Sequence, residues 1–287
     1  MKAQKNIILV PIDFTPVTRC ALDHAVALAK LLKHEICLLH IVSGDYYERR
    51  LATYTDTLIQ KDLLKMGEEA IGDSKIKISA IVREGNIFDD IGAVAKEIDA
   101  YLIVMGTHGT VGLQKVFGSR ALKVITNSTV PFVVVQKKMQ HTIVNGFKDI
   151  VLPLNLTKES KQQLGWAVHL AKKFNSKVHL ITTQEKDEFL KKKLEANLAF
   201  AKRALLENGI LYSLKIVEGH DFAEQTMEYA THINANLIMA MTSENKELSD
   251  FFIGPFEEKM INNKFQIPVM CVNPRKDIYI SQGILGF

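Results

Sequence analysis

The chain repeats its own sequence pattern, and this repeat constrains the fold more than any other feature of its 287 residues. Val10 to Thr15 reads VPIDFT, and 142 residues later Leu152 to Thr157 reads LPLNLT. Self-similarity over a long period indicates two copies of one structural unit. Three further matches support the repeat: Ile36 to Leu39 with Val178 to Ile181, Glu84-Gly85 with Glu218-Gly219, and Ile103 to Met105 with Met239 to Met241.

The offset between matched residues falls from 142 to 136 along the second copy, so this copy is expected to be six residues shorter between its second and fourth strands. Residues 1–138 and 147–274 are predicted to form two domains, and the polar, basic stretch between them is predicted to be a linker. The remaining residues, 275–287, are an apolar tail that is expected to pack either against the same chain or on a second chain.

The first copy alternates short apolar runs with amphipathic segments, a pattern typical of βαβ units around a parallel sheet. Thr15 and Pro16 are expected to start the first helix as N-cap and first helical residue. Strands are expected at 7–12, 36–42, 76–82, 101–105 and 131–135, and helices at 16–32, 57–70, 87–98 and 119–126. The fold class is therefore α/β, with two Rossmann-like parallel-sheet domains in tandem.

Composition excludes several other classes of protein. The chain is 47% hydrophobic and 24% charged, which is typical of a globular protein, and its net charge of +4 is too small to indicate nucleic acid as a partner. Its 3 cysteines are widely spaced and predict neither a disulfide framework nor a metal cluster, which favours a reducing cytosol. No apolar run approaches the length of a membrane span.

Unusual residues end two of the predicted strands. The first strand ends at Asp13, and the fourth ends at Gly106-Thr107-His108-Gly109. With the strand order 3-2-1-4-5, these two strands are neighbours at the switch point, where open α/β sheets bind ligands. Because Thr15 and Pro16 take the positions that start the helix, the Asp13 carboxylate is expected to face the ligand.

The loop after the fourth strand carries Gly106, Gly109 and then Gly118-Ser119, with a helix expected to begin there. Glycines allow backbone N–H groups to approach a phosphate, and a helix N-terminus attracts an anion. The alternative is that these glycines only turn the chain between strand and helix.

These residues resemble the universal stress protein family in both halves of the chain. The resemblance is carried by VPIDFT at 10–15, LLHIV at 38–42, VMGTHG at 104–109, Gly118-Ser119 and PFVVV at 131–135. It implies the strand order 3-2-1-4-5, pairing of domains through their fifth strands and, in one subgroup, ATP binding. By matching position it implies an adenine-nucleotide site, with Mg²⁺ on the phosphates, formed by Pro11, Asp13, Ile41, Met105, Gly106, Gly109, Gly118 and Ser119.

Arg120 follows this motif and is also a candidate for contact with a phosphate, with a solvated first-turn arginine as the alternative. The loop departs from the family pattern, because eight residues rather than nine separate Gly109 from Gly118. This deletion leaves open whether the ligand is ATP, AMP or no nucleotide.

The second copy departs further, with Asn155 for Asp13, Thr242 for Gly106, Asn245 for Gly109 and Gly254-Pro255 for Gly118-Ser119. A proline provides neither an N–H nor a hydroxyl, so the second site is expected to bind no phosphate. The two fifth strands are expected to pair within the chain as a pseudo-twofold, with a homodimer of the whole chain left open.

The residues favour a cytosolic, stress-related regulatory protein that binds one adenine nucleotide per chain, with an unknown protein partner and no membrane or nucleic acid. A nucleotide-free interaction module and a weak ATP-hydrolysing enzyme are the alternatives. No catalytic residues and no metal ligands are predicted, since no Ser/His/Asp or Cys/His set falls on strand ends. His40, His169 and His179 lie in predicted strands or helices and are expected to belong to the packing.

Overall fold

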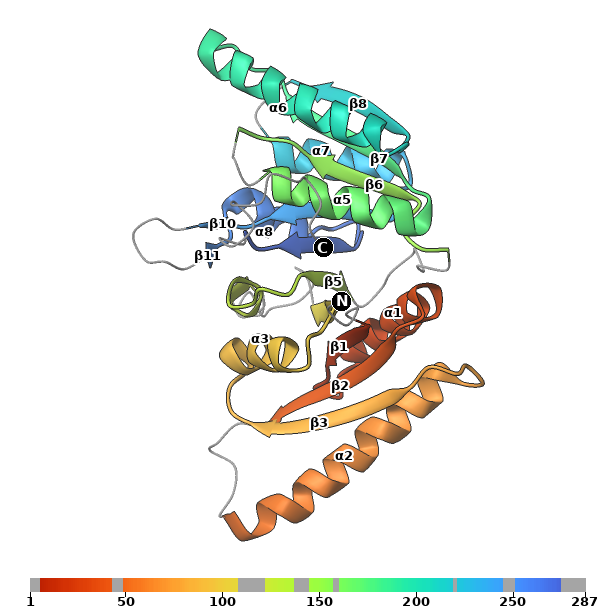
Figure 1. Ribbon diagram of the computed structural model, residues 1–287. Coiled ribbons are helices and arrows are strands. Elements are labelled where there is room, and N and C mark those ends of the chain that lie inside the picture. Colours follow the sequence, from red (N-terminus) through yellow and green to blue (C-terminus); the bar gives the residue numbers. More distant parts are fainter. Residues whose placement is uncertain are drawn as a thin grey trace. The chain divides into compact units, whose positions relative to one another are not determined.

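A computed structural model describes residues 6–42, 49–107, 122–136, 145–156, 160–218, 221–244 and 251–274, without the side chains of 49–54, 160–161, 243–244 and 251–252. The chain divides into two compact units, at residues 1–144 and 145–287. Each unit has a parallel sheet with helices packed against it (Figure 1). The predicted fold class is confirmed in both units.

The first unit has the strand order β3-β2-β1-β4-β5, as predicted. Its strands are β1 (Ile7–Pro11), β2 (Glu35–Val42), β3 (Ile78–Glu84), β4 (Leu102–Thr107) and β5 (Phe132–Gln136). Its helices are α1 (Pro16–Leu32), α2 (Arg49–Ile71) and α3 (Ile87–Glu97), and residues 122–126 are also helical.

The second unit repeats this order as β8-β7-β6-β9-β12. Its strands are β6 (Asp149–Pro153), β7 (Lys177–Thr183), β8 (Tyr212–Val217), β9 (Leu237–Met241) and β12 (Val269–Val272). Its helices are α5 (Ser160–Phe174), α6 (Glu188–Glu207), α7 (Phe222–His232) and α8 (Pro255–Ile261). A two-stranded antiparallel ribbon of β10 (Ser243–Glu244) and β11 (Phe251–Phe252) follows β9.

The central strands are apolar along their length because helices cover both faces of a parallel sheet. In β1 the side chains of Ile8, Leu9 and Val10 are fully buried. Helix α1 starts where the sequence predicts, with Thr15 as N-cap and Pro16 at the first helical position. Helix α2 begins eight residues before its predicted start, at Arg49 rather than Thr57.

The strand pairing corrects one part of the predicted repeat. Leu9 pairs with Ile103 in the first unit, and Val151, which lies 142 residues after Leu9, pairs with Ile238. Ile103 therefore corresponds to Ile238, an offset of 135, whereas the sequence match of Ile103 with Met239 is wrong by one residue. The sequence agrees with this pairing, because an offset of 135 aligns Leu102-Ile103 with Leu237-Ile238 and Thr107 with Thr242, all identical residues.

None of the described helices combines the length and the apolar character that crossing a bilayer requires. The three cysteines are free thiols: Cys37 and Cys271 are buried, and Cys20 is half-buried.

Candidate functional site

The predicted site residues that the structure describes lie at the carboxyl ends of three adjacent strands in the first unit. Strand β1 lies between β2 and β4, so Pro11 and Asp13 have Ile41 on one side and Met105-Gly106 on the other. Asp13 is exposed and Met105 is buried, while the other three are half-buried. Gly109, Gly118, Ser119 and Arg120 lie outside the described residues.

Asp13 has a second role that the sequence analysis did not predict. Its Oδ1 accepts hydrogen bonds from the backbone N–H of Thr15 at 3.0 Å and from the Thr15 hydroxyl at 2.6 Å. Thr15 itself makes no side-chain cap bond to α1. Thr15 rather than Asp13 is the N-cap of α1, as expected, but Asp13 orders the turn that leads into the helix. Among the described residues, Oδ2 of Asp13 has no hydrogen-bond partner.

The turn between β1 and α1 is held in place by His40. The Nδ1–H of His40 donates to the Ile12 carbonyl at 2.7 Å, and its ring lies 5.2 Å from that of Phe14. Phe14 has a φ of 61°, a left-handed conformation that is unfavourable for a residue with a large side chain. His40 thus packs as predicted, and it also orients the segment that carries Asp13.

Gly106 is required by packing within the protein. A Cβ atom on Gly106 would lie 2.5 Å from Cγ1 of Val17 and 2.6 Å from the Val17 carbonyl oxygen. Any side chain at this position would therefore push α1 away from β4. The glycine of the motif is explained here by close packing of helix on strand, which is a different reason from approach to a phosphate.

Thr107, directly after Gly106, is buried with 5% of its surface exposed. Its hydroxyl has no hydrogen-bond partner among the described residues. A buried hydroxyl without a partner costs roughly 1–3 kcal/mol, so a partner for it is expected at this end of the strand. Its burial is not evident from the sequence, because Thr107 is a polar residue that follows Gly106 and precedes His108 at the end of the strand.

With the corrected offset of 135, Met241 is the residue equivalent to Gly106, and Thr242 is the residue equivalent to Thr107. Thr242 is 2% exposed, and its hydroxyl donates to Oδ1 of Asn273 at 2.5 Å. The two threonines therefore occupy equivalent positions, and the one in the second unit is satisfied by a neighbouring side chain. The prediction that Thr242 replaces Gly106 was wrong, and the replacement is a larger residue, methionine.

In the second unit, a side chain of α8 itself caps the N-terminus of this helix. Gly254 is the N-cap and Pro255 the first helical residue, which makes Glu257 the third. The Glu257 carboxylate accepts backbone hydrogen bonds from Glu257 and Gly254, as in a capping box, while burial raises its pKa. A carboxylate therefore occupies the end of this helix where a phosphate would otherwise be attracted.

Another polar cluster lies at the opposite end of the second sheet, where the sequence analysis placed no site. His179 accepts or donates at both ring nitrogens: Nε2 lies 2.8 Å from Oδ1 of Asp149, and Nδ1 lies 2.8 Å from the Ser213 hydroxyl. His179 is buried in the sheet, as expected, and it also joins Asp149 and Ser213 in a hydrogen-bonded set at the amino ends of three strands, where the sequence predicts no Ser/His/Asp set. The three residues are far apart in sequence, and the pairing of His179 with Ser213 across β7 and β8 brings them together.

Comparison with known proteins shows what the two units are similar to. The model of the universal stress protein family matches residues 5–136 and again residues 146–273. Universal stress protein MJ0531 of Methanocaldococcus jannaschii is 33% identical over 138 residues, which are 45% of this chain and 81% of that protein.

Two solved structures extend the comparison. A universal stress protein of Archaeoglobus fulgidus aligns with 95% of this chain and 100% of its own, at a TM-score of 0.77 and 19% identity. A universal stress protein solved in complex with cAMP aligns with 36% of this chain and 76% of its own, at a TM-score of 0.29 and 19% identity. On the match of both its halves to one family model, the chain belongs to the universal stress protein family, with two family domains in tandem.

Proposed function

We propose that the protein is a regulatory nucleotide-binding protein of the cytosol that holds one adenine nucleotide in its first domain. ATP with Mg²⁺ is the first candidate for this ligand. The observation that carries the proposal is the placement of Pro11, Asp13, Ile41 and Met105 on three neighbouring strand ends at the switch point of the sheet. Open α/β sheets bind ligands at this point.

The described residues are chemically suited to a nucleoside. Pro11, Ile41 and Met105 offer apolar surface to a base, and the exposed Asp13 carboxylate keeps one oxygen available for a ribose hydroxyl. The Thr107 hydroxyl, which has no hydrogen-bond partner in the part of the chain that the structure describes, adds a polar group next to the glycine loop. Gly109, Gly118 and Ser119, together with Arg120, would hold the phosphates, and Mg²⁺ would neutralise part of their charge.

The second domain supports a stoichiometry of one. Glu257 occupies its helix N-terminus, and the segment after β9 pairs with itself as the β10–β11 ribbon. A phosphate at α8 would have to displace a carboxylate and would meet Pro255, which has no N–H to donate. We therefore assign the nucleotide to the first domain alone.

Calorimetric titration with ATP and Mg²⁺ tests the site. Gly118→Val should block the approach of the phosphates, and Ser119→Ala should weaken affinity by about ten- to hundredfold through loss of a charge-assisted hydrogen bond. Gly254→Val, the matched change in the second domain, should leave the affinity unchanged. Equal affinity in all four proteins would remove the proposed site, and absence of binding in the unmutated chain would favour a nucleotide-free interaction module.

A further inference from the structure

The Asp149, His179 and Ser213 cluster has the proton arrangement of an activated nucleophile. A carboxylate can only accept, so in the neutral ring Nε2–H donates to Asp149 and the Nδ1 lone pair accepts the Ser213 hydroxyl proton. The side chain of His179 is 5% exposed and that of Asp149 is 36% exposed. A serine bonded to a histidine that a carboxylate orients is the recurring arrangement of nucleophilic catalysis.

The first domain shows that the fold does not need this cluster. By strand pairing, Asp149, His179 and Ser213 correspond to Ile7, Cys37 and Ser79. The first domain therefore retains the serine but has neither the base nor the carboxylate. Since the first sheet forms with Ile7 and Cys37 at two of these positions, the fold does not require the aspartate and the histidine of the second domain.

A groove with a volume of about 530 Å³ lies next to the cluster, between β8 and α7. Its walls carry both apolar and charged side chains: Lys215, Ile216, Val217, Glu218, Gln225, Glu228, Tyr229 and His232. Tyr229 connects the groove to the cluster, because its hydroxyl lies 3.3 Å from Nδ1 of His179.

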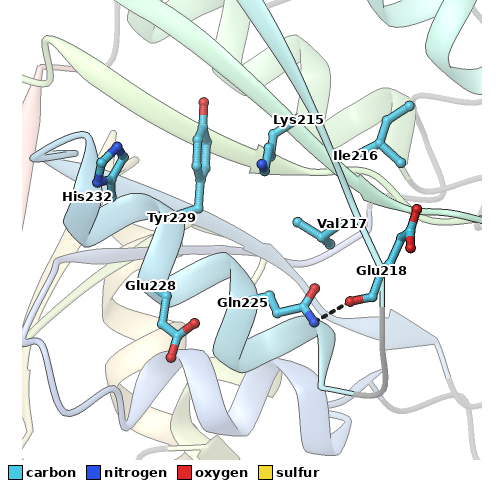
Figure 2. A pocket seen from close by; sticks show the side chains of 8 residues that line it. All are labelled: Lys215, Ile216, Val217, Glu218, Gln225, Glu228, Tyr229 and His232. Atoms are coloured by element: carbon cyan, nitrogen blue, oxygen red, sulfur yellow. Dashed lines mark hydrogen bonds between the residues drawn. The ribbon is translucent and has the colours of Figure 1, made fainter.

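Figure 2 shows the Tyr229 ring projecting away from α7 beside Lys215, with Gln225 held by its hydrogen bond to the Glu218 carbonyl. Side chains alternate between the two faces of a strand, so Ser213 lies on the same face of β8 as Lys215 and Val217. Ser213 is half-buried at the end of this row. Ser213 does not line the groove itself, so a small molecule would reach its hydroxyl from the end of the groove where Tyr229 meets His179.

We propose that Ser213 is the nucleophile of a second site, which accepts the acyl group of small esters from the groove. The Ser213 oxygen forms a bond to the acyl carbon while its proton passes to Nδ1 of His179. The ester bond then breaks, and the leaving alkoxide takes that proton from His179. Water, activated by the same nitrogen, hydrolyses the acyl-serine to a carboxylic acid and restores the hydroxyl. Asp149 is a positioning residue, because it holds the ring in the tautomer that accepts from serine.

A fluorophosphonate probe tests the nucleophile directly in the full-length protein. The serine oxygen replaces fluoride at phosphorus, and the serine proton leaves with fluoride as HF. We expect one label per chain, located by peptide mass spectrometry on Ser213, and hydrolysis of p-nitrophenyl acetate at the same site. Ser213→Ala should abolish both, whereas Ser79→Ala, the matched change in the first domain, should leave both unchanged.

Two variants test the base and its orientation. His179→Gln should slow labelling by about 10²- to 10⁴-fold through loss of the general base. Asp149→Asn keeps the shape but donates to Nε2, which should force the proton onto Nδ1 and slow labelling by about a hundredfold or more. Nitrogen NMR of the imidazole should report this tautomer change directly, independently of labelling.

A merely structural cluster predicts a different result. If intact protein takes up no probe, or if Ser213→Ala is labelled at the same rate as the unmutated chain, the proposal is wrong. Labelling that persists unchanged in a folded Asp149→Asn protein, with the tautomer switched, would equally overturn it. The thermal unfolding curve of each variant shows whether it is folded.

Discussion

Gly106 and Val17 are in such close contact that a single added carbon on Gly106 would lie 2.5 Å from the Val17 side chain and 2.6 Å from its carbonyl oxygen. We therefore predict that Gly106→Ala lowers the free energy of unfolding by about 1–3 kcal/mol, because the added carbon overpacks the interface between α1 and β4. Urea unfolding without nucleotide measures this loss.

Gly67→Ala provides the matched control. A Cβ at Gly67, within α2, would lie 2.7 Å from Cγ2 of Ile78 and 3.1 Å from Cδ1 of Leu38, so it would meet side-chain atoms alone, whereas a Cβ at Gly106 would also meet a backbone carbonyl. Alanine also favours helix over glycine by up to about 1 kcal/mol. Its net effect should therefore be much smaller than that of Gly106→Ala, and equal losses would contradict the packing explanation.

Thr107 and Thr242 are equivalent in the two units, and their substitutions by valine are predicted to differ in their effect on stability. Thr242→Val should destabilise the protein by about 1–3 kcal/mol, since Oδ1 of Asn273 loses a buried donor. Thr107→Val should cost nothing in the nucleotide-free protein, because the hydroxyl that it removes has no partner among the described residues. The same change should weaken nucleotide binding. Thermal unfolding with and without ATP distinguishes the two, and a large loss of stability in nucleotide-free Thr107→Val would show that the hydroxyl is structural.

Asp13 combines an internal role with a proposed ligand role, and two substitutions separate them. Asp13→Asn keeps an oxygen acceptor for Thr15, so the unfolding free energy should stay nearly constant while nucleotide affinity falls. Asp13→Ala also removes both bonds to Thr15 and should cost about 1 kcal/mol in stability. Chemical unfolding and calorimetric titration of both proteins give the two quantities. If Asp13→Asn bound nucleotide as tightly as the unmutated chain, the role of Asp13 would be confined to the turn.

His24 should make stability depend on pH. Burial in α1 lowers the pKa of His24 from its ordinary value of 6.5 to about 4, so the folded protein takes up this proton only at lower pH than the unfolded chain. The stabilisation is complete above pH 6.5 and is lost as the pH falls toward 4, by up to about 3 kcal/mol. Urea unfolding between pH 7.5 and 4 should show this fall, and His24→Leu should remove that part of it. An identical pH dependence in both proteins would contradict the assignment.

The sequence was sufficient to predict the fold because each local signal agreed with the global one. Thr15-Pro16 marked the start of α1, and the apolar run from Ile7 marked the buried central strand. Matching one copy against the other failed by one residue at Ile103, because the match rested on a run of three residues, whereas the longer segment aligns Leu102-Ile103 with Leu237-Ile238. The pairing of Ile238 with Val151 agrees with this longer alignment.

The sites were predictable only where a motif is contiguous. Asp13 and Gly106 lie in contiguous motifs, so the sequence identifies them as site residues. The hydrogen bonds of Asp13 to Thr15 and the contact of Gly106 with Val17 depend on three-dimensional geometry, which residue spacing does not show. The His179 cluster was missed for the same reason. Its members come from three strands, and strand register alone brings them within hydrogen-bond distance.

Native mass spectrometry of the full-length protein with ATP and Mg²⁺ tests the central claim most directly, because it counts nucleotides on each chain. We predict a single added nucleotide that disappears in Gly118→Val and persists in Gly254→Val. Two nucleotides per chain, or one that is retained in Gly118→Val and lost in Gly254→Val, would contradict the assignment of the site to the first domain.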